Sequence, residues 1–279
     1  MDDSSYQQLL DEIAKADAVI VGIGPDFSEA AGLVLKGGSR AFDERFSDFA
    51  NDFFLRSIEQ GERFKWTRPE NKWAFTARLL QYLRDSEPGQ PYADLVRLLE
   101  GKEFFALTPN CDGLAARALG DEHVAMLRGD YRWLQCEKGC TDRVYPSEGY
   151  IDELVANTSG CAIPSELVPT CPECGRPLTP WVYGYEFLEG EHHKRQFERW
   201  NAFLEKNINS KIVFLQLGAG MKNQEYLKLP FWNMTMQHPD AFYVAIEKQA
   251  AFAPPEIEEK ALTFEGDIAA ILHRAASFE

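Results

Sequence analysis

Three short apolar runs place the strongest constraint on how this chain can fold. They cover residues 18–21, 103–107 and 211–217. Runs this short and this apolar are typical of strands buried on both faces of a sheet. A glycine loop and a short helical stretch follow the first run, and a polar turn and another helical stretch follow the second. This repeated order predicts a parallel α/β sheet with helices on both of its faces.

Further segments continue the pattern on both sides of these runs. An amphipathic helix is expected at 6–16 and a last helix at 268–275. The composition and spacing of the remaining apolar segments predict additional strands at 123–127, 131–134, 241–246 and 261–264.

Two segments interrupt this order. Residues 35–100 are rich in aromatic residues and helical in pattern, and residues 136–180 contain five of the six cysteines. We interpret both as insertions that form a smaller domain. The predicted boundaries are 1–34, 101–135 and 205–279 for the large domain, and 35–100 and 136–204 for the small one.

Charge and hydropathy exclude several classes of partner. The 279-residue chain has a formal net charge of −15, which disfavours general binding to the phosphate backbone of nucleic acids. No stretch approaches the roughly 20 apolar residues that a membrane-spanning helix needs. The acidic N-terminal segment lacks the features of a signal peptide, so we expect a cytoplasmic protein whose cysteines remain reduced.

Four cysteines form two closely spaced pairs. Cys136 and Cys140 are separated by three residues, and Cys171 and Cys174 by two. Each pair can direct two sulfur atoms at one point, and four thiolates around a tetrahedral ion form a closed, structural zinc site. The pattern therefore predicts structural Zn²⁺ bound by these four residues. Cys161 is an alternative ligand, and unrelated buried or free thiols are the alternative without a metal.

The loop after the first run contains Gly22 and Gly24. Glycines at this point allow backbone N–H groups to approach a pyrophosphate, and the N-terminus of the following helix favours negative charge. Asp26 would repel a phosphate unless its carboxylate points outward. A simple turn between strand and helix is the alternative interpretation.

A polar turn follows the second run. Asn110 and Asp112 stand at the carboxyl end of a predicted strand, where open α/β sheets bind their ligands. Both side chains can hydrogen-bond a ribose or an amide. An Asx turn without a ligand is the alternative.

Taken in order along the chain, these motifs resemble those of the sirtuin family. The order is the glycine loop at 22–24, the turn at 108–113 with its Asn-x-Asp-Gly motif, Arg128-Gly129, the two cysteine pairs, and a late strand that ends at 218–220. The local runs at 22–32, 128–131, 218–223 and 229–235 resemble those of the class M, macrodomain-linked sirtuins of microbes.

The resemblance implies a Rossmann-like NAD-binding domain with a smaller domain, part helical and part zinc ribbon, inserted into it. It also implies NAD as cofactor and protein ADP-ribosyl transfer as the activity. The partner would be a protein substrate, with a lipoyl carrier protein and a macrodomain hydrolase as candidates. The implied catalytic positions are Asn110, Asp112 and Arg128, and the implied NAD-binding positions are Gly22, Ile23, Gly24, Ser28, Gly32, Gly218, Ala219, Gly220 and Glu247.

Arg128 departs from the family pattern, which has histidine or, in class M, glutamine at the catalytic position. Arginine is always protonated and cannot accept a proton as a general base. Glu247 stands where the family usually has an asparagine that contacts the adenine ribose. A non-catalytic module that binds NAD or ADP-ribose is therefore one alternative function. Lysine deacylation is another, although it depends most on the missing histidine.

Overall fold

The computed structural model describes residues 3–184, 186–221 and 224–278 and divides into two compact units. We call them the sheet unit and the cysteine unit. The sheet unit comprises Met1–Gly32, Pro88–Gly129 and His193–Glu279, and the cysteine unit comprises Leu33–Glu87 and Asp130–His192. Among the described residues, no helix has both the length and the apolar composition required to span a membrane.

A six-stranded parallel sheet forms the centre of the sheet unit, in the order β3-β2-β1-β7-β8-β9. The order reverses direction at β1, as in Rossmann-like sheets. The predicted fold class is thus confirmed. The strands are β1 (Ala18–Ile23), β2 (Glu103–Thr108), β3 (Val124–Met126), β7 (Ile212–Leu217), β8 (Ala241–Glu247) and β9 (Ala261–Glu265).

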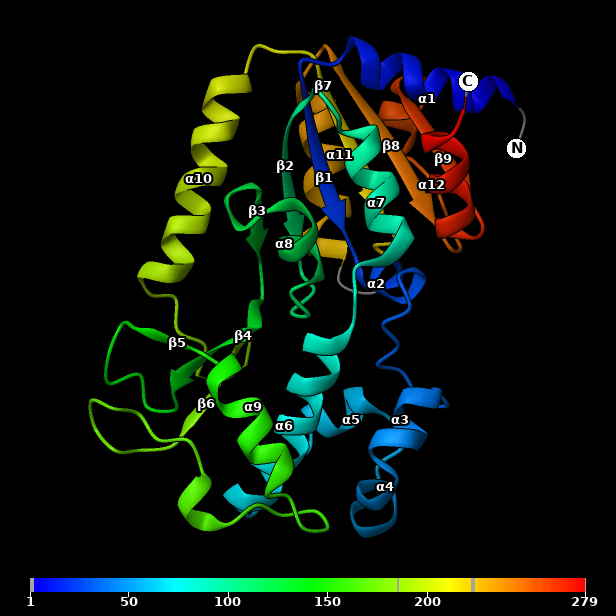
Figure 1. Cartoon of the computed structure of the whole chain (residues 1–279). Helices are drawn as coiled ribbons and strands as arrows, with labels where there is room; N and C mark the ends of the chain where they lie inside the picture. Colours follow the sequence, from blue (N-terminus) through cyan, green and yellow to red (C-terminus); the bar gives the residue numbers. More distant parts are fainter. Residues whose placement is uncertain (1–2, 185, 222–223, 279) are drawn as a thin grey trace. The chain divides into compact units, whose positions relative to one another are not determined.

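Helices cover both faces of this sheet. Trp200 and Phe203 of α10 and Phe231 of α11 belong to one apolar cluster with Ile20 and Phe214 of the strands. Helix α12 packs against α1, α2 and α7, and in Figure 1 α7 stands in front of the strands and α11 behind them. The helices are α1 (Asp3–Lys15), α2 (Pro25–Ala30), α7 (Gly89–Leu98), α8 (Leu114–Leu119), α10 (Glu191–Asn207), α11 (Lys228–Gln237) and α12 (Ile268–Ala276).

The cysteine unit combines helices with a three-stranded sheet in the order β5-β4-β6. The segment expected as a strand at 131–134 lies in this sheet, where β4 pairs antiparallel with β5. The unit contains α3 (Arg40–Arg45), α4 (Ser47–Phe53), α5 (Ile58–Glu62), α6 (Pro69–Asp85), α9 (Glu148–Ala156), β4 (Gly129–Cys136), β5 (Val144–Pro146) and β6 (Leu178–Val182).

Two segments that the sequence analysis placed in the small domain, 88–100 and 193–204, belong to the sheet unit. Their apolar residues explain this difference. Tyr92 of α7 packs its ring 4.8 Å from that of Phe27, and Trp200 of α10 packs 5.5 Å from Phe105 of β2. Both helices therefore bury their apolar faces on the parallel sheet and its helices.

The carboxyl ends of β1 and β7 approach each other very closely. Gly24 donates its N–H to the carbonyl oxygen of Leu217 at 2.9 Å, and Asp26 donates its N–H to that of Gly218 at 3.0 Å. A Cβ atom on Gly24 would lie 2.3 Å from the Gly218 carbonyl oxygen and from the Ala219 Cα. The contact is between two backbones, so neither side can yield by rotating a side chain.

We therefore expect Gly24→Ala to lower the free energy of unfolding by about 3 kcal/mol, near the upper end for overpacking. Gly149→Ala is the matched control, because a Cβ there meets no atom within 4 Å and the residue lies in α9. Alanine should be neutral or stabilise that helix by up to about 1 kcal/mol. Urea unfolding of both variants checks this, and equal midpoints would contradict it.

Candidate functional site

Three hydrogen-bonded side chains lie at the carboxyl ends of β1 and β2. The Nδ2 group of Asn110 donates to the carbonyl oxygen of Gly24 and to the hydroxyl of Ser28, both at 2.9 Å. The Ser28 hydroxyl donates to Oδ2 of Asp112 at 2.7 Å. All three side chains are buried. An amide, a hydroxyl and a carboxylate are thus held in fixed positions at the sheet edge where such folds bind ligands.

The backbone of the turn positions two of these groups. Thr108 donates its hydroxyl to the carbonyl oxygen of Ile23 at 2.7 Å and accepts the Asn110 N–H at 3.1 Å. Asp112 accepts the Leu114 N–H on Oδ1 at 2.9 Å, which is the Asx turn considered from the sequence. The turn and the contact to Ser28 coexist because they use different oxygens of one carboxylate.

Tyr92 was not singled out from the sequence. Burial raises the pKa of its hydroxyl well above the usual value, and the nearby carboxylate of Asp112 raises it further. The phenol therefore stays neutral beside Asp112. Its place in an amphipathic helix predicts burial but not proximity to Asp112.

The glycines of the loop after β1 are also needed for contacts within the protein. Their small size, which the sequence analysis links to the approach of a pyrophosphate, allows close packing against protein groups as well. Gly24 meets the β7 loop, and a Cβ on Gly22 would lie 2.7 Å from the Phe231 ring. Ile23 is fully buried in β1, and Gly32 follows α2 with a φ of +95°.

The loop after β7 is organised by Glu247 at the end of β8. The carboxylate accepts the N–H of Ala219 at 3.2 Å on Oε1 and that of Gly220 at 2.9 Å on Oε2. Gly218 and Gly220 have φ values of +59° and +67°, a conformation that favours glycine. The sequence interpretation placed Glu247 against an adenine ribose. In the structure its side chain is fully buried and holds the loop from inside.

Two further buried polar residues surround this carboxylate. Gln216 donates its Nε2 to Oε1 of Glu247 at 2.5 Å, and Nζ of Lys228 lies 3.9 Å from the same oxygen. Burial raises the pKa of Glu247, while the Gly220 N–H and the Lys228 charge act against this rise. Gln216, a polar residue inside an apolar strand, is the one sequence signal that marks this cluster.

Arg128 lies just after β3 and is partly buried. Its guanidinium carbon lies 5.6 Å from the centre of the Tyr226 ring, a cation–π contact. The thiol of Cys111 lies 3.3 Å from the Arg128 carbonyl oxygen. Arg128 therefore belongs to the same unit as the group of Asn110, Ser28 and Asp112.

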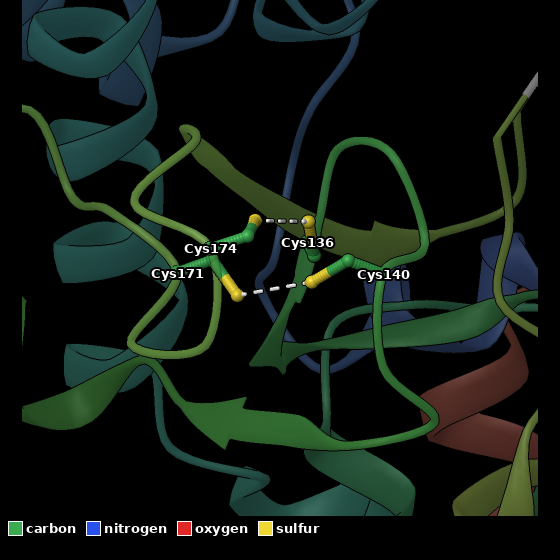
Figure 2. A group of neighbouring side chains, drawn as sticks. All are labelled: Cys136, Cys140, Cys171 and Cys174. Carbon is green, nitrogen blue, oxygen red and sulfur yellow. Dashed lines mark hydrogen bonds between the residues drawn. The ribbon is translucent and has the colours of Figure 1, made fainter.

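The four predicted cysteine ligands converge in the cysteine unit, as Figure 2 shows. Their sulfur atoms all lie within 4.8 Å of one another. The Sγ–Sγ distance is 3.7 Å between Cys136 and Cys174 and 3.6 Å between Cys140 and Cys171. Cys161 is not a member of this group.

The protein environment lowers the pKa of two of the four thiols, whereas hydrogen bonds to the Cys174 sulfur and burial raise the pKa of Cys140. Burial raises the pKa of Cys171, but N–H groups of Glu173 and Cys174 outweigh it and bring the pKa to about 7. The pKa of Cys136 is also lowered, because backbone hydrogen bonds from Cys140 and Lys138 outweigh burial. Metal ligation requires thiolates, and Cys136 and Cys171 are the two ligands that the protein itself helps to deprotonate.

Known proteins similar to this chain agree with the fold and the motifs. No family model matches the chain. It is 31% identical to a protein ADP-ribosyltransferase of Staphylococcus aureus, over 99% of this chain and 89% of that protein. It is 32% identical to an NAD-dependent protein deacylase of Thermus thermophilus, over 69% and 75% of the two chains.

The fold can also be compared with solved structures. The crystal structure of a Sir2 homologue in complex with NAD matches with a TM-score of 0.64 and 19% identity, covering 97% of this chain and 92% of the other. At this identity the match concerns the fold alone. Together with the full-length similarity to the S. aureus protein, it shows that this chain belongs to the sirtuin family.

Proposed function

We propose that this chain binds NAD and transfers its ADP-ribose to a protein. The observation that carries the proposal is the buried group of Asn110, Ser28 and Asp112 at the carboxyl edge of β1 and β2. The S. aureus relative is named for the same activity. Deacylation receives less support, because the deacylase relative matches only 69% of this chain and Arg128 cannot act as a base.

We assign the three side chains to the nicotinamide ribose. Asn110 supplies an amide and Asp112 a carboxylate, both of which suit ribose hydroxyls. Cleavage of the bond between ribose C1′ and the nicotinamide nitrogen leaves the electron pair on nicotinamide and positive charge on the ribose. The carboxylate of Asp112 would stabilise that charge as it develops.

Arg128 favours a particular kind of acceptor. An acidic side chain is already ionised at pH 7 and can attack C1′ without giving up a proton. The reaction then needs no general base, and a guanidinium can hold the acceptor carboxylate through paired hydrogen bonds. We therefore propose transfer to an aspartate or glutamate of the partner protein. An enzymatically inactive NAD-binding module is the alternative, motivated by the same residue.

The local runs shared with class M sirtuins suggest the partner. We propose that this chain belongs to that class and modifies a lipoyl carrier protein, with a macrodomain hydrolase removing the modification. The residues that support this are the loop at 22–32 and the run at 229–235.

We further propose that one structural Zn²⁺ is bound by the four cysteines. Zinc–sulfur bonds of about 2.3 Å in a tetrahedron place the sulfur atoms about 3.8 Å apart. The Sγ–Sγ distances of 3.7 Å for Cys136 and Cys174 and 3.6 Å for Cys140 and Cys171 fit this geometry. A cytoplasmic location, where thiols stay reduced, would keep all four available.

Glu247 is proposed as a positioning residue for the NAD-binding loop. Because its carboxylate accepts both loop amides, it fixes the path of Gly218–Gly220 without contacting the cofactor. In this proposal the loop after β1 also contributes through its shape and not through side-chain contacts with NAD. The residues that set this shape are Gly22, Ile23, Gly24 and Gly32.

Replacing Asn110 tests the proposed activity. Asn110→Ala should reduce kcat/KM for NAD turnover by about a hundredfold or more, because the variant lacks the fixed amide that contacts the reacting ribose in this proposal. Nicotinamide release, measured by chromatography, checks this. Asn201→Ala, on the exposed face of α10, should leave turnover unchanged. A wild-type rate no higher than that of Asn110→Ala would rule out the enzyme, and calorimetric NAD binding would then support the inactive module.

Zinc content tests the cysteine site. We expect one zinc per chain by mass spectrometry, and Cys174→Ser should lose it and destabilise the cysteine unit by more than about 4 kcal/mol. Cys161→Ser is the matched control and should keep its zinc. Loss of zinc from that control instead would assign Cys161 as a ligand.

Glu247→Gln tests the positioning role. Glutamine can accept only one of the two loop N–H groups, so KM for NAD should rise about tenfold while kcat changes little. The double variant Lys228→Met/Glu247→Gln should be more stable than Glu247→Gln alone, because it does not leave a buried lysine without its partner. An unchanged KM in steady-state kinetics would refute the role.

A further inference from the structure

The cysteine unit contains a cavity of 610 Å³ that the proposed NAD chemistry does not use. It lies between the segment after α5, helix α6, and strands β4 and β6, all within this unit. Its volume falls in the range of small-molecule sites. Aromatic side chains form much of its lining, among them Phe64, Trp66, Phe75 and Tyr131.

The aromatic wall is preformed. The Trp66 ring lies 4.7 Å from that of Phe64 and 5.4 Å from that of Phe75. The indole N–H of Trp66 donates to the carbonyl oxygen of Gly61 at 3.2 Å. A Cβ on Gly61 would lie 2.1 Å from the Phe75 ring, so the backbone packs directly on that ring. A ligand would therefore meet a rigid apolar surface and would not have to order it.

Lys72 brings a positive charge to this cavity. Lys72 lies in helix α6 and is partly buried. Its Nζ donates a hydrogen bond to the Thr179 hydroxyl at 3.0 Å. Within the described part of the chain, no carboxylate forms an ion pair with it. Burial lowers the pKa of Lys72, while Glu137 and Glu186 oppose this at longer range. A partly buried ammonium with no carboxylate in contact is stabilised when an anion pairs with it directly.

The other charged residues restrict the kind of anion. Glu62 lines the same cavity and accepts a hydrogen bond from the Tyr131 hydroxyl at 2.6 Å. Glu186 also lines it and pairs with Lys138 at 3.3 Å. Arg63 lines it too, but its guanidinium pairs with Glu59 at 3.1 Å. The two lining carboxylates would repel a polyanion such as a nucleotide phosphate chain. One negative charge placed at Lys72, with an apolar body against the aromatic wall, is the arrangement that the lining accepts.

From this geometry we propose that the cavity is a binding site for a small monocarboxylate with an apolar, planar body. The carboxylate pairs with Lys72 and Thr179, and the body packs on the partly exposed rings of Trp66 and Phe64. The residues of this site belong to a different unit from those of the proposed NAD site, and the proposal does not depend on that site.

A matched pair of probes tests the proposal on the whole protein. 2-Naphthoate and 2-naphthamide share one ring system, but only the first carries a charge. Isothermal titration calorimetry of the wild-type chain should give an affinity for naphthoate about tenfold or more above that for naphthamide, the value of one charge-assisted contact. Equal affinities, or no binding of naphthoate, would overturn the proposal without any variant.

Variants then locate the site. Lys72→Met should reduce naphthoate affinity to the level of naphthamide, whose own binding should persist. Lys65→Met, at an exposed lysine of the neighbouring segment, should leave both affinities unchanged. If Lys65→Met weakens naphthoate binding as much as Lys72→Met does, a general charge effect replaces the proposed site. If Lys72→Met fails to fold, Lys72→Arg takes its place. The arginine variant keeps the positive charge and should retain the preference for naphthoate over naphthamide.

Discussion

The position of β1 between β2 and β7 is the constraint on which the sheet unit depends. Parallel pairing in register brings the carboxyl ends of these strands to one edge. Two loops and a turn then meet there, and space is so limited that Gly24 touches the backbone of the β7 loop. The hydrogen bonds from Asn110 to Gly24 and Ser28 span the junction on the other side of β1. The candidate site is therefore a consequence of strand order rather than of any single motif.

At this edge of the sheet, backbone N–H groups already form hydrogen bonds with other groups of the protein. The N–H groups of Gly24 and Asp26 bind carbonyl oxygens of the β7 segment, and those of Ala219 and Gly220 bind Glu247. In this conformation of the protein, a ligand would contact side chains more than backbone N–H groups. Glu247 acts as an internal anion for a loop of the kind that elsewhere binds external ones. Burial of this carboxylate is costly, and its contacts with the two loop N–H groups, Gln216 and Lys228 offset that cost.

Sequence reasoning recovered the features that depend on local pattern. The apolar runs predicted β1, β2 and β7, and the spacing of Cys136, Cys140, Cys171 and Cys174 predicted their convergence. It did not recover features set by contacts between distant segments. The inward orientation of Glu247 depends on a loop 27 residues away. The assignment of α7 and α10 to the sheet unit depends on which neighbour their apolar faces meet, and an amphipathic pattern does not specify that neighbour.

The charge balance shows why individual cations matter in this molecule. A net charge of −15 repels anions at long range, but screening limits that effect to about 10 Å in ordinary salt. Binding of an anion therefore depends on the few positive groups within contact distance. Arg128, held over Tyr226, and Lys72, held by Thr179, are two such groups in different units. Each of these two contacts is to an uncharged group, a phenol ring in one case and a hydroxyl in the other. An acidic chain can thus discriminate among anions, because only those that reach these fixed cations overcome the general repulsion.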